Sequence, residues 1–150
     1  MSFLLVSSAF KDDGFIPPWY CRGGSDCSPP LGWTAPPAGA ASLALTVRSS
    51  PGGEVLWVVY NIPPEERTFW GRIPRDEVLF DGASQGRNSA GNIGWDGPGA
   101  GGGEETVRFT LAALDIVPDL GEGATAEELE GAMKGHVIET AQLIGRYRPH

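Results

Sequence analysis

The chain has 150 residues, and its formal net charge at neutral pH is −8. This length is typical of one domain with a substantial hydrophobic core, and we expect a single domain over residues 1–150. The acidic balance argues against a nucleic-acid partner, which requires a basic surface, and against binding to an anionic membrane.

The N-terminal segment "MSFLLVSSAF" has a short apolar run but lacks the basic and long apolar regions of a secretory signal. No stretch of the chain approaches the length of a transmembrane helix. We therefore expect a cytoplasmic protein, in which Cys21 and Cys27 are free thiols rather than a disulfide. With no third cysteine and no histidine nearby, no metal site is predicted, and no pattern calls for a cofactor.

Three segments have the apolar pattern of β-strands. In "ASLALTVRS", residues 41–49, Leu43, Leu45 and Val47 point to one face and polar residues to the other. The run "VLWVVYNI", residues 55–62, is apolar on both faces, which is typical of a central strand covered on both sides. "TVRFTLAALDI", residues 106–116, alternates again. Turns rich in Gly and Pro separate these runs, so we predict a mostly β chain folded as an antiparallel sandwich.

The C-terminal part of the chain has a helical pattern. Thr125 and Glu128 fit a capping box, and an apolar stripe follows at helical spacing. After Gly135, apolar residues over 137–144 continue at helical spacing. The pattern predicts one or two short helices between about 126 and 147, packed on one edge or end of the sandwich.

Four strings carry a resemblance to a known family. In chain order they are "WYCRGGSDCSPPLGW", "NIPP", "QGRNSAGNIGWDGP" and "GATAEELEGAMKGHVIETAQLIGRYR". Together they resemble the phosphatidylethanolamine-binding protein family, in its bacterial Raf-kinase-inhibitor-like branch, over nearly the whole chain. The resemblance implies a Greek-key sandwich of two antiparallel sheets with short C-terminal helices. It also implies a small pocket for phosphate-type anions, and it makes a homodimer plausible.

The positions that the resemblance places at the anion pocket carry other residues here. Where the family has an Asp-Pro-Asp-Ala-Pro loop, this chain has "SSPGG", which contains Ser49 and Pro51. A His-Trp pair is replaced by Leu56 and Trp57, and the second pocket histidine falls at about Glu105. A phosphate needs hydrogen-bond donors or positive charge, so these replacements predict that the phosphate site is lost.

No other histidine can restore that site. The chain has two histidines, His136, expected in the C-terminal helical region, and His150 at the end of the chain.

The remade pocket is expected to hold a small organic ligand. Trp57, Trp95 and Leu56 are its predicted walls, and aromatic walls with few polar groups favour an apolar or aromatic molecule. The other residues that the resemblance assigns to ligand binding are Tyr20, Ser49, Pro51, Gly94, Gly97 and Pro98.

Glu105 is the candidate for acid–base chemistry. It shares the apolar face of its predicted strand with Val107 and Phe109, where desolvation would raise the pKa of its carboxyl and suit it to proton transfer. Asp96 is its candidate partner across the pocket mouth. The alternative is a solvated loop edge, like that expected of the neighbouring Glu104.

Three functions stay open from the sequence. The first is a small-molecule binder that has lost its phosphate ligand. The second is an enzyme that uses Glu105 and Asp96 for an isomerisation, dehydration or cyclisation, such as a step of secondary metabolism. The third is a protein-binding regulator of kinases or proteases, which the resemblance also implies. Residue types alone do not separate these three.

Overall fold

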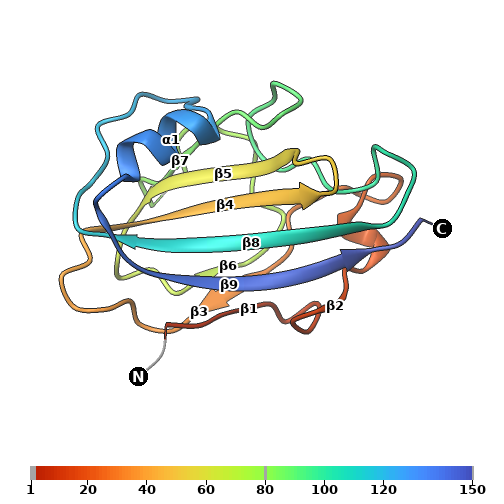
Figure 1. Cartoon of the computed structure of the whole chain (residues 1–150), viewed down its shortest axis with the longest axis horizontal. Coiled ribbons are helices and arrows are strands. Elements are labelled where there is room, and N and C mark those ends of the chain that lie inside the picture. The colour runs from red at the N-terminus through yellow and green to blue at the C-terminus, as the bar shows by residue number, and fades with distance from the viewer. Residues whose placement is uncertain (1–2, 80, 150) are drawn as a thin grey trace.

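The structure, a computed structural model, describes residues 3–79 and 81–149 as two packed β-sheets with one α-helix (Figure 1). The larger sheet has the strand order β2-β9-β8-β4-β5-β7, and the smaller one the order β1-β3-β6. The pairs are antiparallel, except that β2 runs parallel to β9. The elements are β1 (Leu5–Val6), β2 (Gly14–Phe15), the 3₁₀ helix η1 (Pro18–Tyr20), β3 (Leu31–Trp33), β4 (Ser42–Ser50), β5 (Val55–Ile62), β6 (Thr68–Phe69), β7 (Ser84–Gln85), β8 (Glu105–Leu114), α1 (Ala126–Met133) and β9 (Val137–Tyr147).

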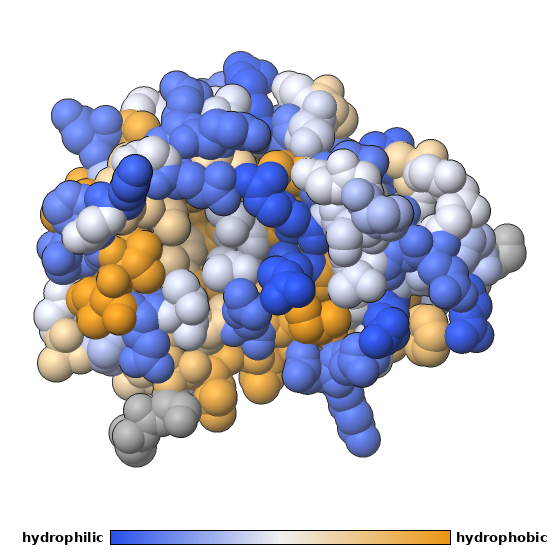
Figure 2. Space-filling model, in the orientation of Figure 1, coloured by the Kyte–Doolittle hydropathy of each residue, from blue (hydrophilic) through white to orange (hydrophobic). Residues whose placement is uncertain are grey.

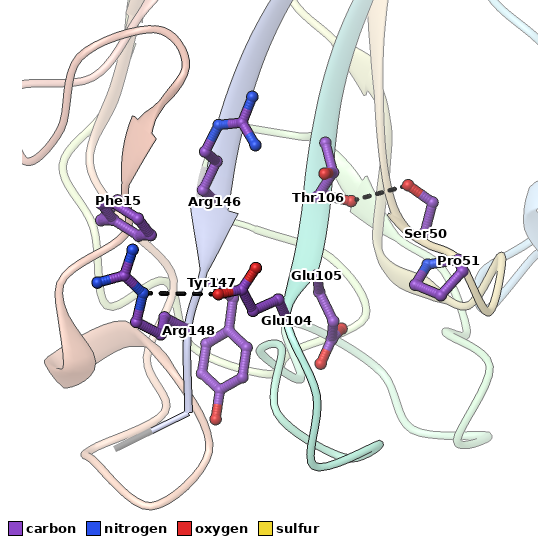
Figure 3. Close-up of a pocket in the computed structure, with 9 residues that line it drawn as sticks. All are labelled: Phe15, Ser50, Pro51, Glu104, Glu105, Thr106, Arg146, Tyr147 and Arg148. Atoms are coloured by element: carbon purple, nitrogen blue, oxygen red, sulfur yellow. Dashed lines mark hydrogen bonds and ion pairs between the residues drawn. The ribbon is translucent and has the colours of Figure 1, made fainter.

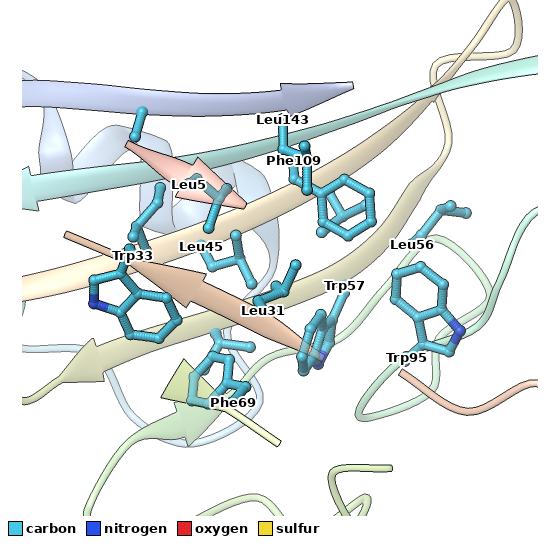
Figure 4. Packing of buried hydrophobic residues seen from close by; sticks show 14 of the residues in the cluster. Leu5, Leu31, Trp33, Leu45, Leu56, Trp57, Phe69, Trp95, Phe109 and Leu143 are labelled. Atoms are coloured by element: carbon cyan, nitrogen blue, oxygen red, sulfur yellow. The ribbon is translucent and has the colours of Figure 1, made fainter. Parts of the chain in front are cut away.

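The predicted alternation of β4 and β8 is confirmed. The register of the pair places Val47 opposite Phe109 and Leu45 opposite Leu111, and all four side chains are completely buried. They face the space between the sheets, where side chains of the smaller sheet such as Trp33 meet them (Figure 4). Burying each of these side chains contributes about 1.5–3 kcal/mol to stability, so this face fixes the register of the central strands.

Strand β5 is covered on both faces, as its sequence predicts. Trp57 and Val59 belong to the core between the sheets, whereas Val58 and Tyr60 belong to a second apolar cluster that includes Leu129 of α1. The helix therefore packs on the outer face of the larger sheet (Figure 1). The prediction that it lies on an edge or end of the sandwich is wrong, because this outer face carries enough apolar area to need a cover.

The C-terminal helical prediction is half confirmed. The capping box is present: Thr125 Oγ1 accepts from the Glu128 backbone N–H, and the Glu128 carboxylate accepts from the Thr125 N–H. The helical continuation beyond Gly135 is wrong, because residues 137–147 form strand β9, which pairs with the full length of β8. Ala141, Leu143 and Tyr147 are buried at period 2, and this burial against β8 overrides the weaker helical spacing.

His136 lies beyond the helix rather than within it. Its backbone N–H donates to the Met133 carbonyl at 2.8 Å, and its ring lies 2.9 Å from a carboxylate oxygen of Asp115. Both side chains are substantially exposed, so this pair ties the turn after α1 to the end of β8 at the surface.

The ends of four strands come together at one end of the larger sheet (Figure 1). The turn of residues 51–54 joins β4 to β5, β8 begins at Glu105, and β9 ends at Tyr147. The long connection 86–104 returns to the same end, since it leads directly into β8. We call this region the loop end, and it holds the candidate site.

Candidate functional site

Glu105 is the polar centre of the loop end. It begins β8 on the face that also carries Val107 and Phe109, as the sequence predicts, and it is half-buried. The hydroxyl of Ser49, a buried residue near the end of β4, donates to one oxygen of its carboxylate. The backbone N–H of Gly99 donates to the other oxygen at 2.7 Å. These two contacts fix the orientation of the carboxylate and join β4, β8 and the long loop.

A small cavity opens on one side of this carboxylate. We call it the loop cavity; its volume is about 200 Å³. Its lining consists of Ser49, Pro51, Gly52, Glu54, Gly101, Gly103, Glu104 and Glu105. Three of these residues are glutamates and none is basic, so the lining of the cavity is acidic.

A second and larger cavity lies on the other side of Glu105, along the end of β9 (Figure 3). We call it the edge cavity; its volume is about 430 Å³. Its lining consists of Phe15, Ser50, Pro51, Glu104, Glu105, Thr106, Arg146, Tyr147 and Arg148. The two cavities share Pro51, Glu104 and Glu105, so they are neighbours across the start of β8.

The arginines of the edge cavity differ in their partners. Arg146 donates to Asp13 at 2.8 Å. Arg148 lies with its guanidinium 4.4 Å from the centre of the Phe15 ring, and its Nε is 3.6 Å from a carboxylate oxygen of Glu104. This second separation is an ion pair beyond hydrogen-bond distance.

Asp96 lies in a different environment from Glu105. It accepts hydrogen bonds from Asn88 at 2.7 Å, from Asn92 at 2.9 Å and from Arg75 at 2.9 Å. Burial raises the pKa of its carboxyl, but these hydrogen bonds and the charge of Arg75 outweigh burial, and the net pKa is lowered. Asp96 is therefore held ionised at neutral pH by its neighbours.

The structure does not bring Asp96 and Glu105 together. Asp96 lines a third cavity of about 180 Å³ with Leu56, and neither residue lines the loop cavity or the edge cavity. The predicted acid–base pair across one pocket is therefore not formed. Leu56 and Glu105, expected in one pocket, line two different cavities, which have Glu54 in common.

Comparison with known proteins identifies the family of this chain. The model of the family "phosphatidylethanolamine-binding protein" (PEBP) matches residues 6–148. The chain belongs to the PEBP family. This confirms the resemblance carried by the four sequence strings.

Relatives of known sequence and structure cover the chain almost completely. A UPF0098 protein of Methanothermobacter thermautotrophicus is 41% identical in an alignment of 147 positions that covers 96% of this chain and 97% of that protein. A UPF0098 protein of Pyrococcus abyssi is 40% identical, over 95% of this chain and 83% of that protein. The PEBP homolog CT736 of Chlamydia trachomatis matches in structure with a TM-score of 0.89, at 34% identity and 99% coverage of both chains. The PEBP family member YbcL of E. coli matches with a TM-score of 0.88, at 25% identity and 100% coverage of both chains.

Two aromatic residues at PEBP pocket positions belong to the core of this chain. Trp57 is fully buried and Trp95 is 3% exposed, and their rings meet edge to face at 5.8 Å. The Trp57 indole N–H donates to Gln85 at 2.7 Å, and that of Trp95 donates to the Tyr20 carbonyl at 3.1 Å. Neither side chain lines the loop, edge or Leu56 cavity, so the prediction that they wall the ligand pocket is not supported. Packing against Phe109 and Phe69 explains their place instead.

Other predicted ligand residues shape the long loop through their backbones. Tyr20 contributes its carbonyl to Trp95, and Pro98 contributes its carbonyl to the Arg22 N–H at 3.0 Å. The Gly97 N–H donates to Asp26 at 2.7 Å. Gly94 has a φ of +101°, which a residue with a side chain rarely adopts. These contacts hold the segment that carries the Gly99 N–H, and Ser49 and Pro51 are the predicted ligand residues that do line the loop cavity.

Arg146 and Arg148, the two basic residues that line the edge cavity, are not identified from the sequence. The helical pattern predicts a helix up to about Tyr147, which conceals the strand position of Arg146, and Arg148 follows directly. As a strand, β9 places Arg146 opposite Thr106, beside the start of β8. The alternation of Leu143, Gly145 and Tyr147 with the polar residues Gln142, Arg146 and Arg148 is the signal in the sequence that indicates this strand.

Both cysteines are free thiols, as expected. Cys21 is buried, and burial together with the charges of Asp26 and Glu105 raises the pKa of its thiol to about 11. Among the described residues, no helix is long and apolar enough to cross a membrane. Hydrophilic residues cover most of the face seen in Figure 2, and apolar residues appear there in separate patches.

Proposed function

We propose that the protein binds a small organic molecule at the loop cavity, that this molecule is uncharged or cationic, and that simple phosphate anions are excluded. The observation that supports the proposal is the Glu105 carboxylate, which two hydrogen bonds hold at the cavity beside Glu54 and Glu104. Each carboxylate at about 4 Å from an anion repels it by roughly 1–4 kcal/mol near a protein surface. The summed repulsion from three carboxylates is larger than the binding free energy that a weak anion site provides.

The hydrogen-bond donors of the loop end also argue against phosphate. The Gly99 N–H and the Ser49 hydroxyl could serve an anion, but both already donate to Glu105. Leu56, at the position of a family histidine, has no side-chain donor, and it lines the neighbouring cavity rather than the loop cavity. A phosphate entering the loop cavity would therefore meet acceptors where it needs donors.

The chemistry of the lining also changes the expected ligand. Because Trp57 and Trp95 pack in the core, the cavity wall is made of Ser, Pro, Gly and Glu residues rather than aromatic rings. Such a wall favours a ligand that carries N–H or O–H donors. The acid–base enzyme with Glu105 and Asp96 receives no support, because none of the three cavities is lined by both residues.

Isothermal titration calorimetry at neutral pH tests this proposal. Inorganic phosphate and methyl phosphate should give no saturable heat at millimolar concentration, whereas the cationic probe n-hexylamine should bind. Glu105→Gln should weaken hexylamine binding by roughly tenfold, which corresponds to about 1.4 kcal/mol.

Glu130→Gln is the matched control, because it removes the same charge from the exposed side of α1, where Glu130 pairs with Arg48. It should leave hexylamine binding unchanged. If Glu105→Gln does not fold, Glu54→Gln tests the same cavity. Saturable binding of either phosphate compound to the unmodified protein, or an equal effect of the Glu105 and Glu130 substitutions, would contradict the proposal.

A further inference from the structure

The loop cavity and the edge cavity are neighbours, and their charged residues differ in sign. The loop cavity is lined by three glutamates, and the edge cavity adds Arg146 and Arg148 beyond the shared Glu104 and Glu105. Figure 3 shows the two arginines on the β9 side and Glu105 and Pro51 on the β4 side of the edge cavity. The volume of the edge cavity, about 430 Å³, is within the range of small-molecule sites. A ligand with a positive and a negative end matches this arrangement.

Arg148 is the better of the two arginines for holding the negative end. The Phe15 ring orients its guanidinium, and the 3.6 Å ion pair with Glu104 uses none of its donors in a hydrogen bond. Within the described part of the chain it makes no other polar contact, so its five N–H donors remain for a bidentate carboxylate. Arg146, in contrast, already donates from Nε to Asp13 at 2.8 Å, and its Nη2 forms an ion pair with the same carboxylate oxygen at 2.8 Å.

Glu104 competes for Arg148 only weakly. The side chains of the pair are 73% and 62% exposed, and an exposed ion pair contributes about 0–1 kcal/mol. A ligand carboxylate can therefore replace it without a large loss of stability.

Glu105 is suited to hold the positive end. Its two carboxylate oxygens accept one hydrogen bond each from Ser49 and Gly99. An ionised carboxylate has about four acceptor sites, so about two remain for an ammonium group. The Glu105 carboxylate lies on the core-facing side of β8, whereas Thr106 and Arg146 of the edge cavity point to the other side. Because Glu105 lines both cavities, a ligand that passes over the start of β8 can place an ammonium group at Glu105 and a carboxylate at Arg148.

We infer that the ligand is a zwitterion with an amino group and a carboxylate at opposite ends, bound with the amino group at Glu105 and the carboxylate at Arg148. This inference rests on the proposed function, which assigns the amino-group end, and adds the carboxylate end and its site.

A calorimetric probe series tests it on the full chain. The probes are γ-aminobutyrate, δ-aminovalerate and ε-aminocaproate, with n-hexylamine and caproate as compounds that carry one of the two charges. At least one amino acid should bind roughly tenfold more tightly than both single-charge compounds, a gain of about 1.4 kcal/mol. The chain length that binds best reports the spacing of the two charged groups.

Three variants assign the carboxylate end. Arg148→Gln should reduce the amino acids to the affinity of hexylamine and leave hexylamine unchanged. Arg108→Gln is the matched control, since Arg108 points to the exposed side of β8 and should have no effect. Glu104→Gln frees Arg148 from its competing partner but also removes one carboxylate from the loop cavity, so it should strengthen caproate binding and weaken hexylamine binding.

The outcomes separate the two proposals. If hexylamine binds and no amino acid binds more tightly, the zwitterion inference fails and the proposed function stands. If Arg148→Gln weakens no amino acid, or weakens it no more than Arg108→Gln does, the inference also fails. If neither hexylamine nor any amino acid binds, the proposed function fails and this inference fails with it.

Discussion

Trp57 and Glu105 lie on strands β5 and β8 of the same sheet, with β4 between them, yet the polar groups around them differ in how completely they are hydrogen-bonded. The Trp57 indole N–H is fully buried and has a buried partner, Gln85. Gln85 is in turn held by hydrogen bonds from its amide to the carbonyls of Pro74 and Asp76. The Trp57 indole N–H and both polar groups of the Gln85 amide are therefore matched, so the aromatic rings can pack around them.

At the loop end, the polar groups are matched only in part. Glu105 has two partners, but Glu54 and Glu104 face the same cavity, and the Arg148 guanidinium has an ion pair in place of hydrogen bonds. Such incompletely matched groups cost little at a solvated surface and are available to a ligand. The comparison indicates that the core determines the sandwich, while a few residues at the strand ends determine what it can bind.

Removing Trp57 should have the largest effect on stability. Trp57→Ala creates a cavity in the core, which costs about 3–5 kcal/mol. It also leaves the buried Gln85 carbonyl without a donor, which adds about 1–3 kcal/mol. Urea unfolding followed by circular dichroism measures the loss.

Trp70→Ala is the matched control, because Trp70 is 83% exposed and its removal should change the free energy of unfolding very little. Equal effects of the two substitutions would show that Trp57 is not part of the core and would remove the basis of the comparison.

The sequence predicted the core better than the loop end for a physical reason. Period-2 burial of Leu43, Leu45 and Val47 is repeated along a strand, so many residues report the same face. The loop end depends on single contacts, such as that between the Gly99 N–H and Glu105, which leave no periodic pattern. Alignment of Trp57 with a family pocket position could not show that its side chain faces the core.

Replacing Asp96 should have an intermediate effect that depends on pH. Asp96→Asn removes the charge from hydrogen bonds made by three donors, and at neutral pH we expect a loss of about 1.5–3 kcal/mol. The folded-state pKa of Asp96 is lowered, so its contribution is present above the unfolded value of about 3.9 and disappears as pH falls through the folded value. The difference between the two proteins should therefore shrink below about pH 4.

Urea unfolding at neutral and acid pH checks this sign. Asp115→Asn serves as the control, because Asp115 is a half-exposed partner of His136. A difference for Asp96→Asn that grows on acidification would contradict the assignment of Asp96 as a stabilising ionised group.

Changing Glu105 should affect binding more than stability. Glu105→Gln keeps one acceptor oxygen for Ser49 or Gly99 and reduces repulsion with the neighbouring glutamates. The net loss in free energy of unfolding should therefore be about 0.5–1.5 kcal/mol. A loss as large as that of Trp57→Ala would place Glu105 with the core and weaken its role as a ligand group.

The two thiols provide the finest test, because Cys21 lies where the core meets the loop end. Its pKa of about 11 results from burial first and then from Asp26 and Glu105, so at neutral pH almost none of it is the reactive thiolate. Cys27 is only half-buried, and native-state labelling with iodoacetamide, followed by mass spectrometry, should modify Cys27 well before Cys21.

Because the folded pKa of Cys21 is raised, its contribution to stability is complete below the unfolded thiol value of about 8.5 and is lost as pH rises toward 11. Glu105→Gln removes one of the charges that raise this pKa and should speed labelling of Cys21 slightly at alkaline pH, whereas Glu130→Gln should not. Labelling of Cys21 before Cys27 would show that the loop end opens to the core more readily than its hydrogen bonds indicate.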